Sequence, residues 1–177
     1  MASLLLDSVA TFTATEVFDY PTLVFYAVLT ALKELDRPAL KKRVIDSPDV
    51  LAALTEAHAA LPELLNALYE GRYAAFLAAL VAVHPAVSRD RYLAPHAGFY
   101  LREMRVAAYR QYLESYKSVT SAGMARAFGV SPAFLDGELS RFIATGRLNA
   151  KIDAVAGACV IGECLPRQAA AGRREGR

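Results

Sequence analysis

Apolar residues recur at helical spacing through most of the first 116 residues of the chain. The segment from Tyr20 to Leu35 is the clearest case, because its apolar residues form a wide stripe at the period of an α-helix. Pro21 falls in the first turn, where a helix tolerates proline. We therefore predict a long helix here, covered by other helices on more than one side.

Prolines divide the next part of the chain into shorter predicted helices. Pro38 separates the first helix from a short basic helix over residues 39–45, and Pro48 separates that helix from another over residues 49–60. A proline removes a backbone donor and clashes with the preceding turn, so each proline indicates a boundary. We expect Pro62 to mark the next boundary.

Residues 62–83 contain two apolar stripes on either side of Gly71. Helix, glycine-centred turn and helix is the pattern of a helical-repeat hairpin, as in TPR-like proteins. We expect Pro85, in the pair His84-Pro85, to end this unit. A further helix is predicted over residues 92–116, interrupted near Pro95.

The pattern changes after Tyr116 and predicts two short helices behind a β-prone stretch at residues 118–120. Thr120 or Ser121 can cap the first helix, and Gly129 can end it in the left-handed conformation. Ser131 and Pro132 start the second helix, which ends at Gly146. One apolar face of this second helix carries Leu135, Leu139, Phe142 and Ile143.

Two β-prone runs follow, over residues 148–152 and 158–161, and the residues between them suit a hairpin loop. Short strand, two helices and a hairpin together describe a winged helix. We therefore predict a mostly α protein, in which helical-repeat hairpins are followed by a winged-helix module with a small antiparallel β-hairpin. The predicted boundaries are 1–116 for the helical repeats, 117–162 for the winged helix and 163–177 for a disordered basic tail.

Composition supports a folded protein outside the membrane. Hydrophobic residues make up 55% of the chain, enough for a core. The longest uncharged apolar-rich runs, Thr22–Leu32 and Ala74–Val83, are shorter than the roughly 18–20 residues that a spanning helix needs. The first residues lack the basic start of a secretory signal. We expect a soluble intracellular protein.

The charge distribution bears on whether the winged helix reads DNA. The formal charge is +2, but the tail after Pro166 contributes +3, so the rest of the chain is close to neutral. The helix that would enter the major groove, Ser131–Thr145, carries Asp136, Glu138 and Arg141, a net charge of −1. That charge is unfavourable beside phosphates. The alternative is that the free edge of the hairpin pairs with a strand of another protein.

No motif of an enzyme is present. The sequence contains no phosphate-binding loop, dinucleotide fingerprint, nucleophile elbow or zinc-protease motif. His58, His84 and His96 lie in separate segments, and we interpret Cys159 and Cys164 as reduced thiols. We therefore predict no catalytic, metal-binding or cofactor-binding residues.

Five tyrosines lie between residues 92 and 116, interleaved with arginines. They could stack on RNA bases. The other interpretation is packing at helix seams, with the ring buried and the hydroxyl in water. The residues concerned are Tyr92, Tyr100, Tyr109, Tyr112 and Tyr116, with Arg102, Arg105 and Arg110.

Several literal motifs add to this picture. MARAFGV (Met124–Val130), ELSRFIATGRL (Glu138–Leu148) and KID (Lys151–Asp153) follow FDYPTLVFYAVLTAL, LYEGRYAAF and LAPHAGFYLREMR in the same order. From about Phe12 to Gly157, the chain resembles the PCI-domain family. Members of this family build the proteasome lid, the COP9 signalosome and the translation initiation factor scaffold.

The resemblance implies a non-catalytic scaffold, with no cofactor or small-molecule substrate, in the cytoplasm and nucleus. Its implied partners are other PCI-domain subunits of the proteasome lid, with the signalosome and the initiation factor as alternatives. The implied winged-helix core is Met124, Phe128, Leu139, Phe142 and Ile143. The implied interface is Leu148, Asn149, Ala150, Lys151 and Ile152. Glu138 and Arg141 are either surface contacts of this interface or a solvated pair at i, i+3.

Overall fold

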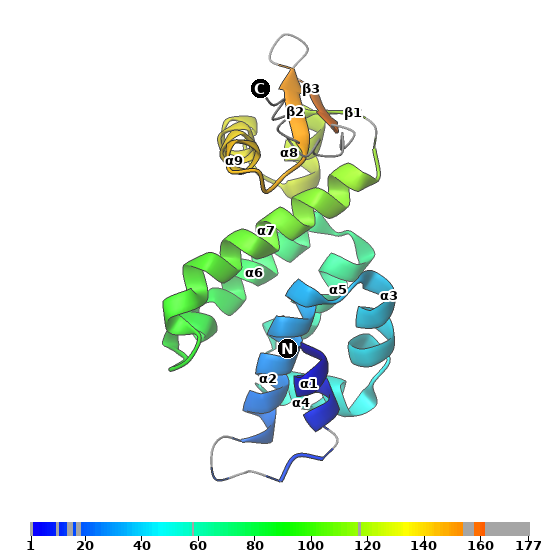
Figure 1. Ribbon diagram of the computed structural model, residues 1–177, viewed down its shortest axis with the longest axis vertical. Coiled ribbons are helices and arrows are strands. Elements are labelled where there is room, and N and C mark those ends of the chain that lie inside the picture. The colour runs from blue at the N-terminus through cyan, green and yellow to red at the C-terminus, as the bar shows by residue number, and fades with distance from the viewer. Residues whose placement is uncertain are drawn as a thin grey trace, which may run out of the picture.

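The computed structural model describes residues 2–9, 11–13, 16, 19–57, 59–116, 118–153 and 158–161. Helices fill the N-terminal part, and a small module of two helices and a sheet lies at one end of the molecule (Figure 1). The mostly α architecture with a terminal winged helix is confirmed. Among the described residues, no helix is both long enough and apolar enough to cross a membrane.

The first long helix forms as predicted, over α2 (Tyr20–Glu34). It packs against α1 (Ala2–Val9), α4 (Pro48–Ala57) and α7 (Ala97–Glu114). Because neighbours lie on several sides, its buried residues exceed a single stripe. They are Leu23, Val24, Phe25, Ala27, Val28, Leu29, Ala31 and Leu32.

The short basic helix is present as α3 (Arg37–Leu40) continued by a wider π-helical turn, η1 (Lys41–Ile45). Leu40 and Val44 are buried, whereas Lys41 and Lys42 are exposed. The segment therefore lies on the surface with one apolar side against the core.

The helical hairpin is confirmed in α5 (Ala60–Glu70) and α6 (Tyr73–Arg89). Gly71 has φ +79°, the left-handed conformation that allows the chain to turn between the helices. The expected boundary at Pro62 is slightly misplaced, because α5 begins at Ala60 and takes the proline into its first turn.

The prediction that Pro85 ends the hairpin is wrong, since α6 continues through it to Arg89. Two interactions hold the last turn in place. Val87 is only 3% exposed, and the amide of Asp90 donates to the carbonyl of Ala86 at 3.2 Å. Pro85 itself lies on the exposed side of the helix, where water can reach the carbonyl that loses its donor.

The next helix is interrupted near Pro95, as predicted. A 3₁₀ turn, η2 (Ala94–His96), precedes α7, which contacts α2 and α6 and leads directly towards the sheet (Figure 1). α7 thus connects the helical part with the terminal module.

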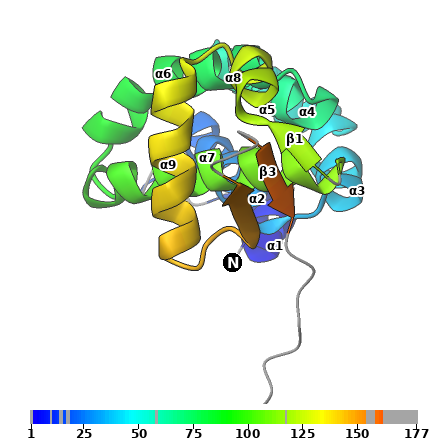
Figure 2. The same ribbon diagram turned by 90° about the horizontal axis from the view of Figure 1, so that it is seen from above.

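The terminal module contains the predicted winged-helix elements. They are β1 (Ser118–Thr120), α8 (Ser121–Phe128), α9 (Pro132–Ala144), β2 (Ala150–Asp153) and β3 (Ala158–Ile161). The strands form one antiparallel sheet in the order β1-β3-β2, and the two helices lie beside it (Figure 2). The predicted hairpin is confirmed, and β1 extends it to three strands.

The helix caps and left-handed glycines of this module occur where the sequence predicts them. The Thr120 hydroxyl accepts from the amide of Gly123, and the Ser131 hydroxyl accepts from the amide of Phe134. Gly129 and Gly146 end their helices with φ +66° and +70°. Of the implied core residues, Met124, Phe128, Leu139 and Phe142 are buried and Ile143 is half-buried.

The first β-run was predicted two residues too early, because β2 begins at Ala150 rather than Leu148. The amides of Arg147 and Leu148 both donate to the carbonyl of Phe142, at 2.9 and 3.3 Å, so these residues belong to the turn that closes α9. Leu148 is 4% exposed and packs in the core.

The domain boundaries 1–116 and 117–162 stay predictions. The tail 163–177, Cys164 and the side chain of Cys159 lie outside the described residues, and so does His58.

Candidate functional site

The three-stranded sheet has two open edges. Because β3 lies in the centre, β1 and β2 each pair on one side only within the described part of the chain. Backbone groups along such an edge can accept a further strand. β2 is the longer of the two edges.

The predicted interface residues differ in how buried they are and in where they lie relative to β2. For Leu148 the strand prediction is corrected, because the residue lies in the turn before β2 with its side chain buried, whereas its place in the interface stays a prediction. Asn149 is exposed just before β2. Within the strand, Ala150 is buried, Lys151 is exposed and Ile152 is half-buried, so the strand presents alternate side chains to the core and to the surface.

Glu138 is a second correction, because it is a buried partner of α7 rather than a surface contact or a solvated pair with Arg141. It is 8% exposed, and its carboxylate accepts from the guanidinium of Arg105 at 2.9 Å and from the hydroxyl of Tyr109 at 3.1 Å. Arg141 is exposed. The sequence does not indicate Arg105 and Tyr109 as partners of Glu138, since they lie 33 and 29 residues upstream.

The hydroxyl of Tyr109 is a firmly protonated donor in this network. Its burial raises the pKa well above the ordinary range, and the neighbouring charge of Glu138 raises it further. The network therefore ties α9 to α7 through one ion pair and one hydrogen bond, both largely out of water.

A second set of polar contacts fixes the turn before β2. Arg110 on α7 donates to the carbonyl of Arg147 at 3.0 Å. The Arg147 side chain forms an ion pair with Glu103, which also lies 3.9 Å from Lys33 on α2. The residues leading into the open edge are thus held against the helical part.

An aromatic cluster fills the junction between the two parts. The ring of Phe128 stacks on Tyr73 at 4.7 Å and meets the edges of Tyr109 and Tyr112 at 4.9 and 5.5 Å. Helices α6, α7 and α8 therefore share one set of rings.

The structure shows which of the five tyrosines pack at helix seams. Tyr100, Tyr109 and Tyr112 pack at seams, but the hydroxyl of Tyr109 is buried rather than wet. For Tyr92 and Tyr116 the seam prediction is wrong, because these side chains are 56% and 50% exposed.

The pairing of Glu138 with Arg105 also changes the charge that α9 would present to DNA. With Glu138 paired to Arg105, the exposed side of α9 carries less negative charge than its sequence suggests. The other charged residues of α9, Asp136 and Arg141, sum to zero, so the helix itself carries no excess of positive charge for phosphates, and DNA reading stays an alternative prediction.

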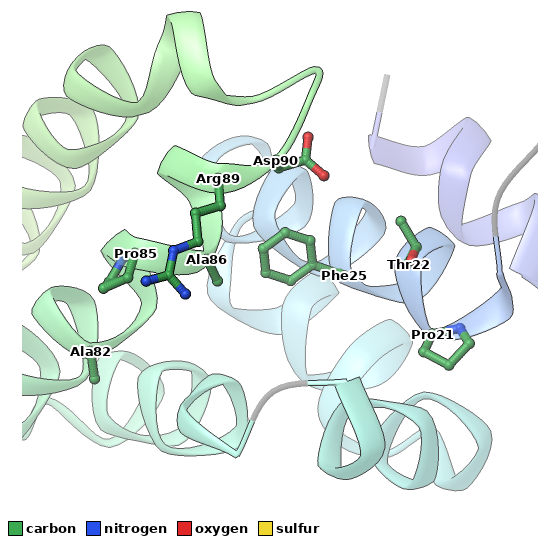
Figure 3. A pocket seen from close by; sticks show the side chains of 8 residues that line it. All are labelled: Pro21, Thr22, Phe25, Ala82, Pro85, Ala86, Arg89 and Asp90. Atoms are coloured by element: carbon green, nitrogen blue, oxygen red, sulfur yellow. The ribbon is translucent and has the colours of Figure 1, made fainter.

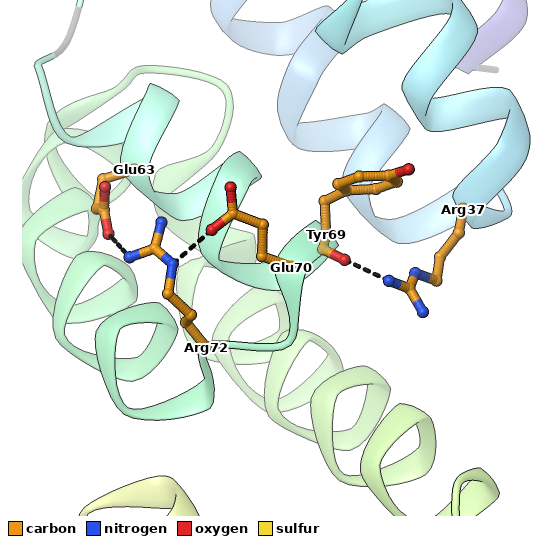
Figure 4. Close-up of polar contacts among 5 residues, drawn as sticks. All are labelled: Arg37, Glu63, Tyr69, Glu70 and Arg72. Atoms are coloured by element: carbon orange, nitrogen blue, oxygen red, sulfur yellow. Dashed lines mark hydrogen bonds and ion pairs between the residues drawn. The ribbon is translucent and has the colours of Figure 1, made fainter.

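Two other features mark the surface of the described residues. A cavity of about 620 Å³ lies between α2 and α6, lined by residues such as Pro21, Phe25, Pro85 and Arg89 (Figure 3). Arg72, in the turn after α5, bridges Glu63 and Glu70 of that helix at 2.8 and 2.6 Å (Figure 4), where all three side chains are about half exposed. Within the described residues, no three His, Cys, Asp or Glu side chains are grouped to hold a metal ion.

The helical hairpin, the connecting helix and the winged helix with its open sheet edge define a PCI domain. A family model described as PCI domain matches residues 81–163, and one described as 26S proteasome subunit RPN7 matches residues 1–43. The chain belongs to the PCI-domain family.

Curated relatives of the chain are named as 26S proteasome regulatory subunits. The chain is 54% identical to the 26S proteasome non-ATPase regulatory subunit 6 homolog of Arabidopsis thaliana, over 88% of this chain and 40% of that protein. It is 51% identical to 26S proteasome non-ATPase regulatory subunit 6 of Oryza sativa, over 90% and 40%. It is 44% identical to 26S proteasome regulatory subunit RPN7 of Saccharomyces cerevisiae, over 88% and 37%. The chain spans about two fifths of the length of the relatives it matches.

Proposed function

We propose that this chain is a non-catalytic scaffold element of the proteasome regulatory particle lid. In this proposal it joins other PCI subunits through its winged helix and so supports ubiquitin-dependent degradation, in the cytoplasm and nucleus. The open edge of β2 carries the proposal, in a chain similar to named 26S proteasome subunits.

The proposed mode of association is strand addition. A strand of a neighbouring subunit would pair with the outer backbone of β2, which supplies affinity, while side chains on either side of the strand supply specificity. Lys151 would lie in the contact, and Ile152 would lose its remaining exposure.

Rigid attachment of the sheet supports this mode. An edge that moves freely loses more entropy on binding than one that is already fixed. The contacts of Glu138 with Arg105 and of Arg147 with Arg110 fix this edge relative to the helices before any partner arrives.

Affinity purification of the tagged chain from its own cells tests the proposal. We expect mass spectrometry to identify lid subunits among the stoichiometric partners. As the salt concentration is raised, these subunits should dissociate from the tagged chain no earlier than they dissociate from the intact lid. Recovery of signalosome or initiation-factor subunits instead would show that the chain belongs to that complex. Recovery of no PCI protein would refute the scaffold role.

A further inference from the structure

A second surface lies at the first turn of α7. Residues of α1, α2, the end of α6, the turn before α7 and the start of α7 line an open groove of about 560 Å³. Its main lining residues are Tyr26, Leu29, Tyr92, Leu93, Phe99 and Tyr100. The volume falls within the range of roughly 300–1,000 Å³ usual for small-molecule sites.

The groove offers ring faces and methyl groups rather than free polar atoms. The hydroxyl of Tyr26 donates to Asp90 at 2.6 Å, and that of Tyr100 donates to the carbonyl of Leu29 at 3.1 Å. The Thr30 hydroxyl donates back to its own helix. A ligand body placed here would therefore have to be apolar, since polar atoms would find no partners.

Two of the aromatic rings that line the groove are exposed to solvent. Tyr92 is 56% exposed and Phe99 is 41% exposed, and both lie at the mouth of the groove. The ring of Tyr92 meets Tyr26 edge to face at 6.4 Å. Flat aromatic surfaces of this kind favour an aromatic ring system as the occupant.

Cations surround the exposed rings. Lys33 lies 4.8 Å and Arg147 5.9 Å from the ring centre of Phe99, and Arg91 lies 5.9 Å from that of Tyr92. The nearby carboxylates are already engaged. Glu103 pairs with Lys33 and Arg147, and Asp90 accepts from Tyr26 and from two backbone amides.

Among these five groups, three cations stand against two engaged carboxylates, which is an excess of one positive charge around the exposed rings. We propose that this groove binds an aromatic monoanion, namely an aryl ring system that carries one carboxylate or sulfonate. The rings enter the groove, and the anionic group lies at the rim near Arg91 or Lys33.

Fluorescence titration of the full chain with 8-anilinonaphthalene-1-sulfonate tests this site. The matched control ligand is N-phenyl-1-naphthylamine, which has the same rings without the sulfonate. We expect saturable 1:1 binding of the sulfonate, about fivefold tighter than the amine at low salt, with the difference lost at high salt. Equal affinity of the two ligands, or no saturable binding, would overturn the proposal.

Two pairs of exposed residues locate the binding. Phe99→Ser should weaken sulfonate binding about tenfold, whereas Phe134→Ser, at the equally exposed Phe134 on α9, should not. Arg91→Glu should remove the preference for the sulfonate, whereas Arg126→Glu on α8 should keep it. An equal effect within either pair would show that the dye binds elsewhere.

Two further readouts complete the test. His96 borders the groove, so its ring proton signals in the NMR spectrum should shift on titration while those of His84 do not. Sedimentation under the same conditions should show a monomer. A dimer that Phe99→Ser dissociates would show that a second copy occupies the groove, and the ligand proposal would fail.

Discussion

A few residues form a buried charged network at the junction between the helical part and the winged helix. Glu138 belongs to a sequence string that suggests a surface ion pair with Arg141, three residues later. The structure instead buries Glu138 against Arg105 and Tyr109 on α7. Helical spacing places two residues on one face of a helix, but it does not reveal which distant helix covers that face. This part of the site could not be predicted from the sequence.

Glu138→Gln should destabilise the chain by about 2 kcal/mol, because Arg105 would lose a largely desolvated charge partner. Urea unfolding monitored by circular dichroism measures this loss. The matched control is Glu70→Gln, which removes a carboxylate from an exposed ion pair with Arg72 and should cost clearly less stability, because solvent screens that pair. Equal losses would contradict the buried network.

The stability that the carboxylate of Asp90 contributes to the fold should be lost in acid. Its burial raises the pKa, but the hydroxyl of Tyr26 and the amides of Leu93 and Tyr92 outweigh this and leave the pKa below its usual value. The stabilisation is therefore present above the unfolded-state pKa, about 3.9, and is lost as the pH falls through the lower folded-state pKa.

The comparison with Asp90→Asn isolates this contribution. The wild-type chain should be the more stable of the two at pH 7, and the difference should shrink as the pH is lowered from about 5 towards 2. Thermal unfolding at a series of pH values measures the difference. A difference that does not change with pH would show that the carboxylate charge is not involved.

Helix and strand boundaries follow from local chemistry wherever a cap or a left-handed glycine sets them. Thr120, Ser131, Gly129 and Gly146 mark the ends of α8 and α9 in the sequence and in the structure. Tertiary packing sets the other boundaries. Burial of Val87 carries α6 through Pro85, which the local signal alone could not indicate.

Two glycines of the winged helix should respond to alanine with opposite signs. Gly129→Ala should cost about 1 kcal/mol, because φ is +66° and the added Cβ would lie 3.4 Å from that of Ala74. Gly137→Ala should add up to about 1 kcal/mol, because Gly137 is exposed in the middle of α9 with nothing within 4 Å of the new Cβ. Chemical denaturation of both variants measures the signs, and a gain for Gly129→Ala would contradict the capping geometry.

At the scale of the whole molecule, the order of elements was predictable and the contacts between its two parts were not. Periodicity, prolines and glycines indicate helices followed by a winged helix. The sequence does not indicate that α7 holds the sheet through Arg105, Arg110 and Tyr109, or that rings from three helices meet at Phe128. These contacts join residues that are far apart in the chain.

Proline substitutions in β2 should separate folding from assembly. Neighbouring residues of an edge strand point their amides in opposite directions, one towards β3 and one outwards. Of Lys151→Pro and Ile152→Pro, one should therefore unfold the sheet, and the other should leave the circular dichroism spectrum intact but abolish co-purification of PCI partners. Two folded variants that both assemble normally would exclude strand addition at β2.

Hydrogen exchange at β2 reports whether a neighbouring strand pairs with the open edge of the sheet. The amides of residues 150–153 are compared between the free chain and the chain in the complex purified from its cells. If a neighbouring strand pairs with the open edge, the outward-facing amides should exchange at least about tenfold more slowly in the complex. Unchanged exchange of these amides in a complex that contains the chain would show that assembly does not use this edge.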